Sequence, residues 1–345
     1  MGRRRRSDAR GQKISPSNSP NFCPLAENYK KNSAVFFGIR TKKYTVFFRS
    51  AIISYMYLPI IISRFSNLLF FIQKTNKYNS IKFDLQKYLS DEELNLSFYG
   101  KGENKIWRQI EKVIGKENAK QIKGFIVFLE PIFVSHWRKT SKHLLLWKRY
   151  FQNNQLLLQQ TILEVKKLSG IKHFAVSKIP IYLISHPASN DKEINAWFSW
   201  TPKESFIVVE IPFNLKVPNN FFPLSVLAHE LFHLMLRKNR NLFLKITKIA
   251  EENEKLLTKL GRGMPNRIFL EELLISSFIP EGYLSKKYFN TKVVSHTSMP
   301  KDLLMWRKFI ASKFYQTAKK YINNAQRIDE KYLKNLTEII KHNTK

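Results

Sequence analysis

Apolar runs of strand length alternate with longer helical patterns in the second half of the chain, and together they predict an α+β fold. Residues 178–185 and 206–211 are rich in β-branched residues, so each predicts a strand, and residues 194–198 between them predict a third. A helix should follow, because Pro223 suits a first helical turn and the cationic run from Arg237 suits the negative end of a helix dipole.

The segment of residues 34–170 has mainly helical patterning. Residues 141–168 form a long amphipathic run, and Gly170 is expected to end that helix. His136 and His143 lie among aromatic residues and carry no metal-binding spacing. We expect both histidines to be packed within a helical layer.

The most apolar stretch of the chain covers residues 44–73. Arg49 and Arg64 bracket only 14 uncharged residues, which Pro59 interrupts, whereas a membrane-spanning helix needs about 20. This stretch therefore predicts a helix that is buried or lies on a membrane surface.

Four regions follow from these patterns. The N-terminal basic run is not followed by an apolar core and a cleavage site, so no secretory signal is predicted, and its Ser-, Pro- and Asn-rich continuation indicates disorder. We expect a disordered basic tail (1–33), a mainly helical region (34–170), a core that carries the chemistry (171–290) and a helical C-terminal region (291–345).

The charge balance is strongly positive. The chain has 59 Lys and Arg against 26 Asp and Glu, a net charge of +33. Such an excess is typical of proteins that contact polyanions, and non-specific contact with nucleic acid or an anionic membrane is expected. The cations are nevertheless spread along the whole chain, and its Lys-, Asn-, Ile- and Phe-rich composition is also what A/T-rich codons produce.

Cysteine usage limits the chemistry. Cys23 is the single cysteine, which excludes an intramolecular disulfide and a cluster of thiolate ligands. A metal ion would therefore have to be held by histidines and carboxylates. One cysteine also fits a reducing, cytoplasmic setting, and membrane association remains open.

The predicted helix after Pro223 carries the sequence His229-Glu230-Leu231-Phe232-His233. Residues four apart lie on one helix face, so both imidazoles can reach one ion, with Glu230 beside them. Zinc takes neutral imidazole nitrogens and leaves a position for water, whose proton Glu230 could accept. One Zn²⁺ per chain is predicted.

A third protein ligand is needed, and three carboxylates qualify. Glu271 and Glu272 lie in an apolar helix expected at residues 266–279, and Glu281 follows Pro280. We favour Glu272, because Ser276 one turn on allows close helix approach. Glu271 has Arg267 at i−4, which suits a surface ion pair.

These residues carry a family resemblance. The strand bearing Asn195-Ala196, the strand through residues 207–209 and the helix with the histidine motif resemble the gluzincin metallopeptidases. The chain is similar there to thermolysin-like enzymes and to the heat-shock and prenyl-protein-processing membrane metalloproteases. The resemblance covers residues 178–285, about a third of the chain.

The resemblance implies a zincin fold and assigns roles. His229 and His233 would be zinc ligands, Glu230 the general base and a downstream glutamate the third ligand. Asn195 and Ala196, with Trp197 beside them, would lie on an edge strand that pairs with the substrate backbone.

This sequence also departs from the family pattern. Glu272 lacks the aspartate that often follows four residues on, and Glu281-Gly282-Tyr283 is similar to the Glu-Gly-aromatic signature of other gluzincins. Stabilising an oxyanion would need a further donor, for which Tyr283, Tyr288 and His296 are candidates.

The sequence thus predicts a zinc metallopeptidase acting on a peptide or protein. The alternative is a catalytically silent basic zincin scaffold that binds nucleic acid or an anionic membrane. Glu230 favours the enzyme, because a silent scaffold has no need of a base between the two histidines.

Overall fold

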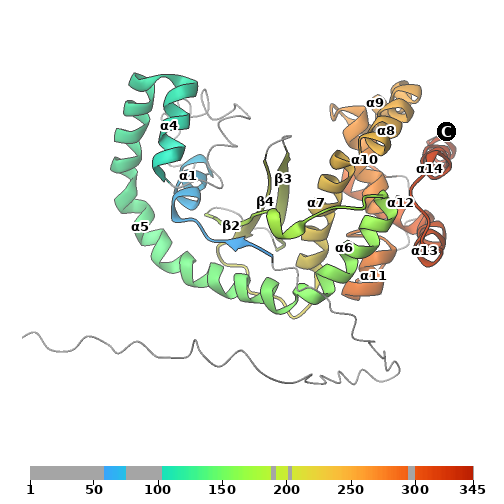
Figure 1. The fold of residues 1–345 in the computed structure, drawn as a ribbon, viewed down its shortest axis with the longest axis horizontal. Coiled ribbons are helices and arrows are strands. Elements are labelled where there is room, and N and C mark those ends of the chain that lie inside the picture. The colour runs from blue at the N-terminus through green and yellow to red at the C-terminus, as the bar shows by residue number, and fades with distance from the viewer. Residues whose placement is uncertain (1–57, 75–102, 188–191, 201–203, 294–299, 345) are drawn as a thin grey trace, which may run out of the picture. The chain divides into compact units, whose positions relative to one another are not determined.

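The computed structural model of the chain describes residues 58–74, 103–187, 192–200, 204–293 and 300–344 (Figure 1). All of them belong to a unit that spans Ser54–Lys345. The predicted tail of residues 1–33, most of the apolar stretch before Leu58 and His296 lie outside the described residues.

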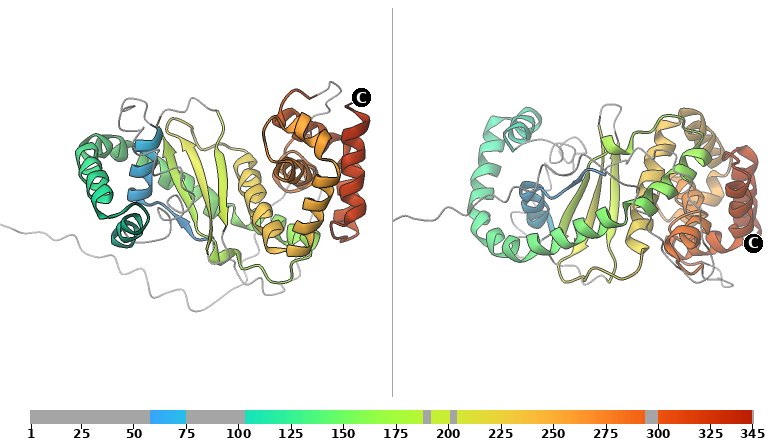
Figure 2. Two further views of the ribbon diagram at one scale, coloured as in Figure 1. Left: turned by 90° about the horizontal axis from the view of Figure 1, so that it is seen from above. Right: turned by 60° about the horizontal axis from the view of Figure 1, so that its bottom comes forward.

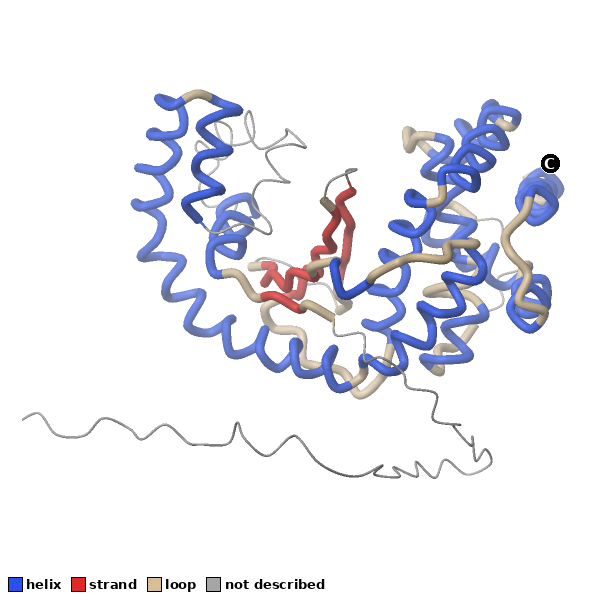
Figure 3. The backbone as a smooth tube through the Cα atoms, in the orientation of Figure 1, coloured by secondary structure: helices blue, strands red, loops and turns tan. Residues whose placement is uncertain are grey.

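The described elements are helices with four strands among them (Figure 3). In chain order they are β1 (Ile60–Ile61), α1 (Arg64–Lys74), α4 (Glu103–Ile114), α5 (Lys116–Asn153), α6 (Gln155–Ser169), the 3₁₀ turn η2 (Val176–Lys178), β2 (Ile181–His186), β3 (Asn195–Trp200), β4 (Ser205–Pro212), α7 (Phe222–Lys238), α8 (Arg240–Glu252), α9 (Glu254–Gly261), α10 (Asn266–Ser276), α11 (Tyr283–Phe289), α12 (Leu303–Lys313), α13 (Tyr315–Asn323) and α14 (Glu330–His342). The expected mixture of a small sheet and many helices is confirmed.

The four strands form one mixed sheet in the order β1-β2-β4-β3. β2 is parallel to β1 and β4, while β3 runs antiparallel to β4 and forms an edge of the described sheet. β1 pairs with only the first two residues of β2. Beyond β1, the side-chain amide of Asn67 in α1 donates to the carbonyl oxygen of Leu183 and accepts from the N–H of Ser185. It thereby provides the hydrogen-bond partners that the short strand β1 does not offer to β2.

The sheet is buried on both faces, because alternate residues of β2 and β4 enter different hydrophobic clusters. One cluster contains residues of α1, α4 and α5 together with Tyr182, Ile184, Phe206 and Val208. The other contains residues of α6, α7 and α10 together with Ile181, Leu183, Ile207 and Val209. Figure 2 shows the sheet between α1 and α7. Near-continuous apolar strands are expected when both faces are covered.

Helix α7 holds the histidine motif and matches its predicted position. It has a proline in its first turn and Arg237 and Lys238 in its last. Nearly every residue from Pro223 to Leu236 is buried, since α7 packs against β3, β4, α6 and α10. The polar side chains of the motif therefore lie in a dry environment, where each needs a partner.

Several predicted boundaries were wrong. The apolar stretch contains β1 before its helix, and α1 starts only at Arg64. The helix expected at residues 141–168 is part of two helices that meet at Asn154, and the first of them, α5, already begins at Lys116. The second, α6, ends before Gly170, which has a left-handed backbone conformation. α10 ends at Ser276 rather than Ile279.

A helix must be both long and apolar to cross a membrane. Among the described helices, none is both long enough and apolar enough to cross a bilayer.

Candidate metal centre

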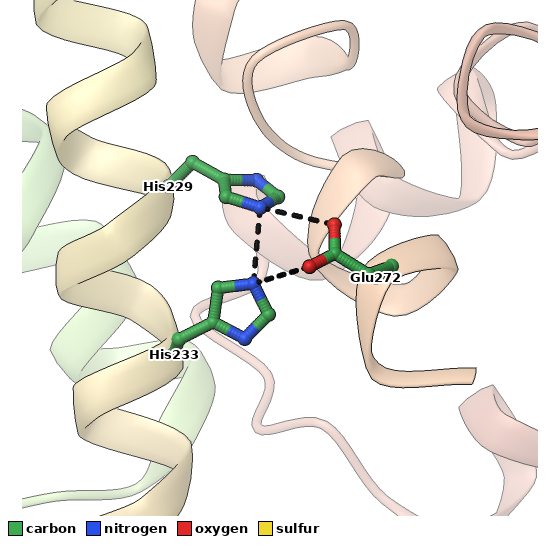
Figure 4. Close-up of side chains that lie close together, drawn as sticks. All are labelled: His229, His233 and Glu272. Carbon is green, nitrogen blue, oxygen red and sulfur yellow. Dashed lines mark hydrogen bonds and ion pairs between the residues drawn. The ribbon is translucent and has the colours of Figure 1, made fainter. Parts of the chain in front are cut away.

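Three side chains from two helices converge on one point (Figure 4). Nε2 of His229 and Nε2 of His233, on α7, lie 3.0 Å apart. Glu272 of α10 places Oε2 3.2 Å from the first nitrogen and Oε1 3.1 Å from the second. In the described part of the chain, these two histidines and this glutamate are the metal-binding types of side chain that lie close enough together to hold one ion.

The outer nitrogen of each ring fixes which nitrogen faces the centre. Nδ1 of His229 lies 3.0 Å from the carbonyl oxygen of Ile279, which can only accept, so Nδ1 carries the proton. Nδ1 of His233 lies 2.8 Å from Oε1 of Glu271 and donates in the same way. In both neutral rings Nε2 then presents a lone pair to the centre.

Two lone pairs and a carboxylate facing one another repel unless a cation lies between them. Oε2 of Glu272 is buried and accepts no well-formed hydrogen bond from the described residues. A tetrahedral zinc ion with bonds of about 2.0–2.1 Å would hold its ligand atoms about 3.3 Å apart, close to the separations found here. The residues present therefore fit zinc in number, chemistry and spacing.

Glu271 corrects the sequence-based expectation of a surface ion pair. Its side chain is fully buried (0 % exposed), although the predicted partner Arg267 does bind it, at 2.7 Å. Arg237 of α7 lies 3.2 Å from the same oxygen. The other oxygen accepts from His233. Glu271 thus orients a histidine of the centre, and the two arginines compensate the cost of burying its charge.

Arg307 of α12 belongs to no motif and was not predicted as a site residue. Its Nη1 lies 3.7 Å from Oε2 of Glu272, and its Nη2 lies 3.0 Å from Oε1 of Glu281. Its Nε donates to Ser276 at 2.9 Å. Ser276 thus reaches Glu272 only through this guanidinium, and Glu281 neutralises Arg307 rather than joining the two histidines.

Burial and charge shift the pKa values of the central groups. Burial disfavours the charged form of His233, but Glu271 and Glu272 outweigh it and raise its pKa to about 10. Burial lowers the pKa of His229, with Glu272 opposing. Burial also works against ionisation of Glu272, yet the histidines hold its pKa well below the usual range. Without metal, a proton on His233 thus relieves the repulsion that a cation would otherwise relieve.

Glu230 lies beside the centre and is almost completely buried. Burial raises its pKa to about 8, while the charge of His233 opposes this. A cation in the centre would favour the ionised carboxylate for the same electrostatic reason. Without a cation, burial therefore favours the protonated form of the Glu230 carboxyl group.

Strand β3 carries the predicted substrate-binding residues. Asn195 is exposed at the start of the strand, and Ala196 packs toward the cluster that contains α7. Trp197 points to the opposite face, where its Nε1 donates to Glu210 at 2.9 Å. Phe198, which the sequence analysis did not select, stacks on the ring of His233 with centroids 5.1 Å apart. The edge strand thus lies next to the centre, with Trp197 facing away from it.

The predicted oxyanion donors are not brought to the centre. The hydroxyl of Tyr283 faces Asn323 on α13, and that of Tyr288 donates to Glu164 at 3.1 Å. His296 lies outside the described residues.

Gly282 has a packing role. A Cβ atom there would lie 2.1 Å from the carbonyl oxygen of Ser277, so no side chain fits. Packing therefore explains the glycine of the Glu-Gly-Tyr sequence without any role in metal binding.

Comparisons with protein-family models, with curated proteins and with solved structures gave no match.

Proposed function

We propose that the chain is a zinc-dependent peptidase of the gluzincin type, with His229, His233 and Glu272 as the protein ligands of one zinc ion. One observation carries the proposal. Two imidazole lone pairs of α7, the helix that also carries Glu230, meet the Glu272 carboxylate of α10 at 3.0–3.2 Å. A zinc ion held there would polarise a substrate carbonyl and make a water molecule more acidic.

The side chains around the centre have separate roles in this proposal. Glu230 accepts the proton of the attacking water and then passes it to the leaving nitrogen. Glu271 and the carbonyl of Ile279 hold the two imidazoles in the tautomers that face the centre. Ser276 and Glu281 bind the Arg307 guanidinium, which places its positive charge beside the Glu272 carboxylate.

The edge strand supports a peptide as the substrate. β3 pairs with β4 on one side only in the described sheet, so its other side offers backbone donors and acceptors. An extended peptide can add to such an edge as a further strand. Phe198 of the same strand lies directly on His233, so an added peptide would run past the metal ligands.

Zinc content and peptide hydrolysis, measured together on one preparation, test the proposal. The wild-type protein should bind one zinc ion and cleave an unstructured protein such as casein in a reaction that a chelator stops. The His229→Ala/His233→Ala double variant should lose both properties. Full zinc content in the double variant would place the metal elsewhere. A zinc-loaded wild-type protein that cleaves no peptide would refute the peptidase.

A further inference from the structure

A cavity lies at the start of α8, and none of the residues of the metal centre lines it. It has a volume of about 610 Å³ and is lined by the end of α6, the junction of α7 and α8, and the segment before α14. That volume lies within the range of about 300–1,000 Å³ typical of small-molecule sites.

The lining of this cavity has one sign of charge. Five cationic side chains and one histidine contribute to it: Lys172, Lys238, Arg240, Lys245, Arg327 and His173. No acidic residue is among its lining residues. Like charges brought together on a concave wall focus a positive potential, which concentrates anions. The scattered lysines of the rest of the sequence do not explain such an arrangement.

Two carboxylates near the cavity, Asp329 and Glu330, have partners at the start of α14. Asp329 accepts the backbone N–H of Tyr332 at the start of α14 and the hydroxyl of Tyr321. Glu330 forms an ion pair with Lys334 at 2.7 Å. Glu330 also interacts electrostatically with Lys245 of the lining, so it offsets a part of the positive charge of the cavity.

The backbone holds the three segments of the wall together. The side-chain amide of Asn239 donates to the backbone carbonyl oxygen of Ser169, and the backbone N–H of Ile328 donates to the carbonyl oxygen of Leu168 at 2.8 Å. Gly170, at φ +69°, leaves space for Arg327, whose side chain would lie 3.1 Å from a Cβ atom there. The cations are thus carried on a fixed frame rather than on separate loops.

We infer that this cavity binds a small phosphate-bearing molecule with two or more negative charges. Arg240 and Arg327 can each contact phosphate oxygens through two N–H groups, and the lysines add point charges around them. At the start of α8 the Asn239 side chain already accepts from the N–H of Leu242, so only the first N–H groups of the helix, at Arg240 and Asn241, remain to face a ligand. The volume of about 610 Å³ suits a small ligand.

Titration with tripolyphosphate tests the inference, using isothermal calorimetry on the full chain. One ion should bind per chain, and the Arg240→Gln/Arg327→Gln variant should bind about tenfold more weakly or worse. Lys259→Gln/Lys319→Gln is the matched control, because it removes two charges at exposed sites outside the cavity lining. This control should change the affinity by less than about twofold.

Two further measurements keep the result unambiguous. Zinc content measured before and after titration shows whether tripolyphosphate extracts metal. Lys172→Gln/Lys245→Gln provides a second cavity variant if the arginine variant does not fold. The inference is overturned if no saturable binding occurs, or if the control pair loses as much affinity as the cavity pairs. Binding of a single-stranded oligonucleotide, but not tripolyphosphate, through this cavity would also overturn it.

Discussion

Nδ1 of His233 lies 2.8 Å from Oε1 of the fully buried Glu271. This contact explains how a charged carboxylate next to Glu272 can be buried without being a metal ligand. Glu271 points to the outer nitrogen of the ring, whereas Glu272 points to the inner nitrogen. Adjacent residues on a helix project about 100° apart, so the two carboxylates serve one histidine from different sides.

The Glu271→Gln variant should lower zinc affinity by about 10–100-fold, because the amide no longer orients and polarises His233 as a carboxylate does. Stability should also fall, since Arg237 and Arg267 lose their shared partner. Competition with a chromophoric zinc chelator measures the affinity. Glu130→Gln, which removes an exposed carboxylate paired with Arg64, is the control. Wild-type affinity in Glu271→Gln would show that the contact does not support the metal site.

The third ligand can be identified by comparing two further carboxylates. Glu272→Gln should weaken zinc binding more than Glu271→Gln, because it removes a ligand rather than a support. Glu281→Gln should have a smaller effect, since Glu281 reaches the centre only through Arg307. Side-by-side zinc affinities decide the point. If Glu281→Gln alone lost the metal, Glu281 would be the ligand.

Gly282→Ala should destabilise the fold by about 3 kcal/mol, because the added methyl group would overlap the backbone of Ser277. Gly124→Ala is the matched control. A Cβ there meets nothing within 4 Å in helix α5, so alanine should add up to about 1 kcal/mol of stability. Chemical denaturation of both variants measures the change. Equal stability of the two variants would contradict the packing role of Gly282.

The sequence predicted the parts of the site that depend on local spacing. His229 and His233 share a face because any α-helix brings residues four apart together. The three strands and α7 were likewise predictable, since their patterns are continuous in sequence. Glu272 was preferred to Glu271 because of Ser276 one turn on and an expected surface ion pair of Glu271 with Arg267. The structure places Glu272 with the two histidines, but the expectation that Glu271 lies on the surface was wrong.

The sequence could not predict features that depend on distant segments. An i,i+4 pair such as Arg267 and Glu271 is typically on the surface, and only the packing of α7 on α10 shows that it is buried. Arg307 comes from a helix without any recognisable motif. β1 has two residues, too few to produce a period, and forms because the first two residues of β2 offer backbone partners.

The most direct test of the central proposal is peptide hydrolysis by the Glu230→Gln variant at full zinc occupancy. The amide keeps the size of the side chain but cannot accept a proton, and the ligands His229, His233 and Glu272 are unchanged. We predict one zinc ion per chain, as in the wild type, with hydrolysis reduced by about 10²–10⁴-fold. Hydrolysis at the wild-type rate with the zinc retained would contradict the account.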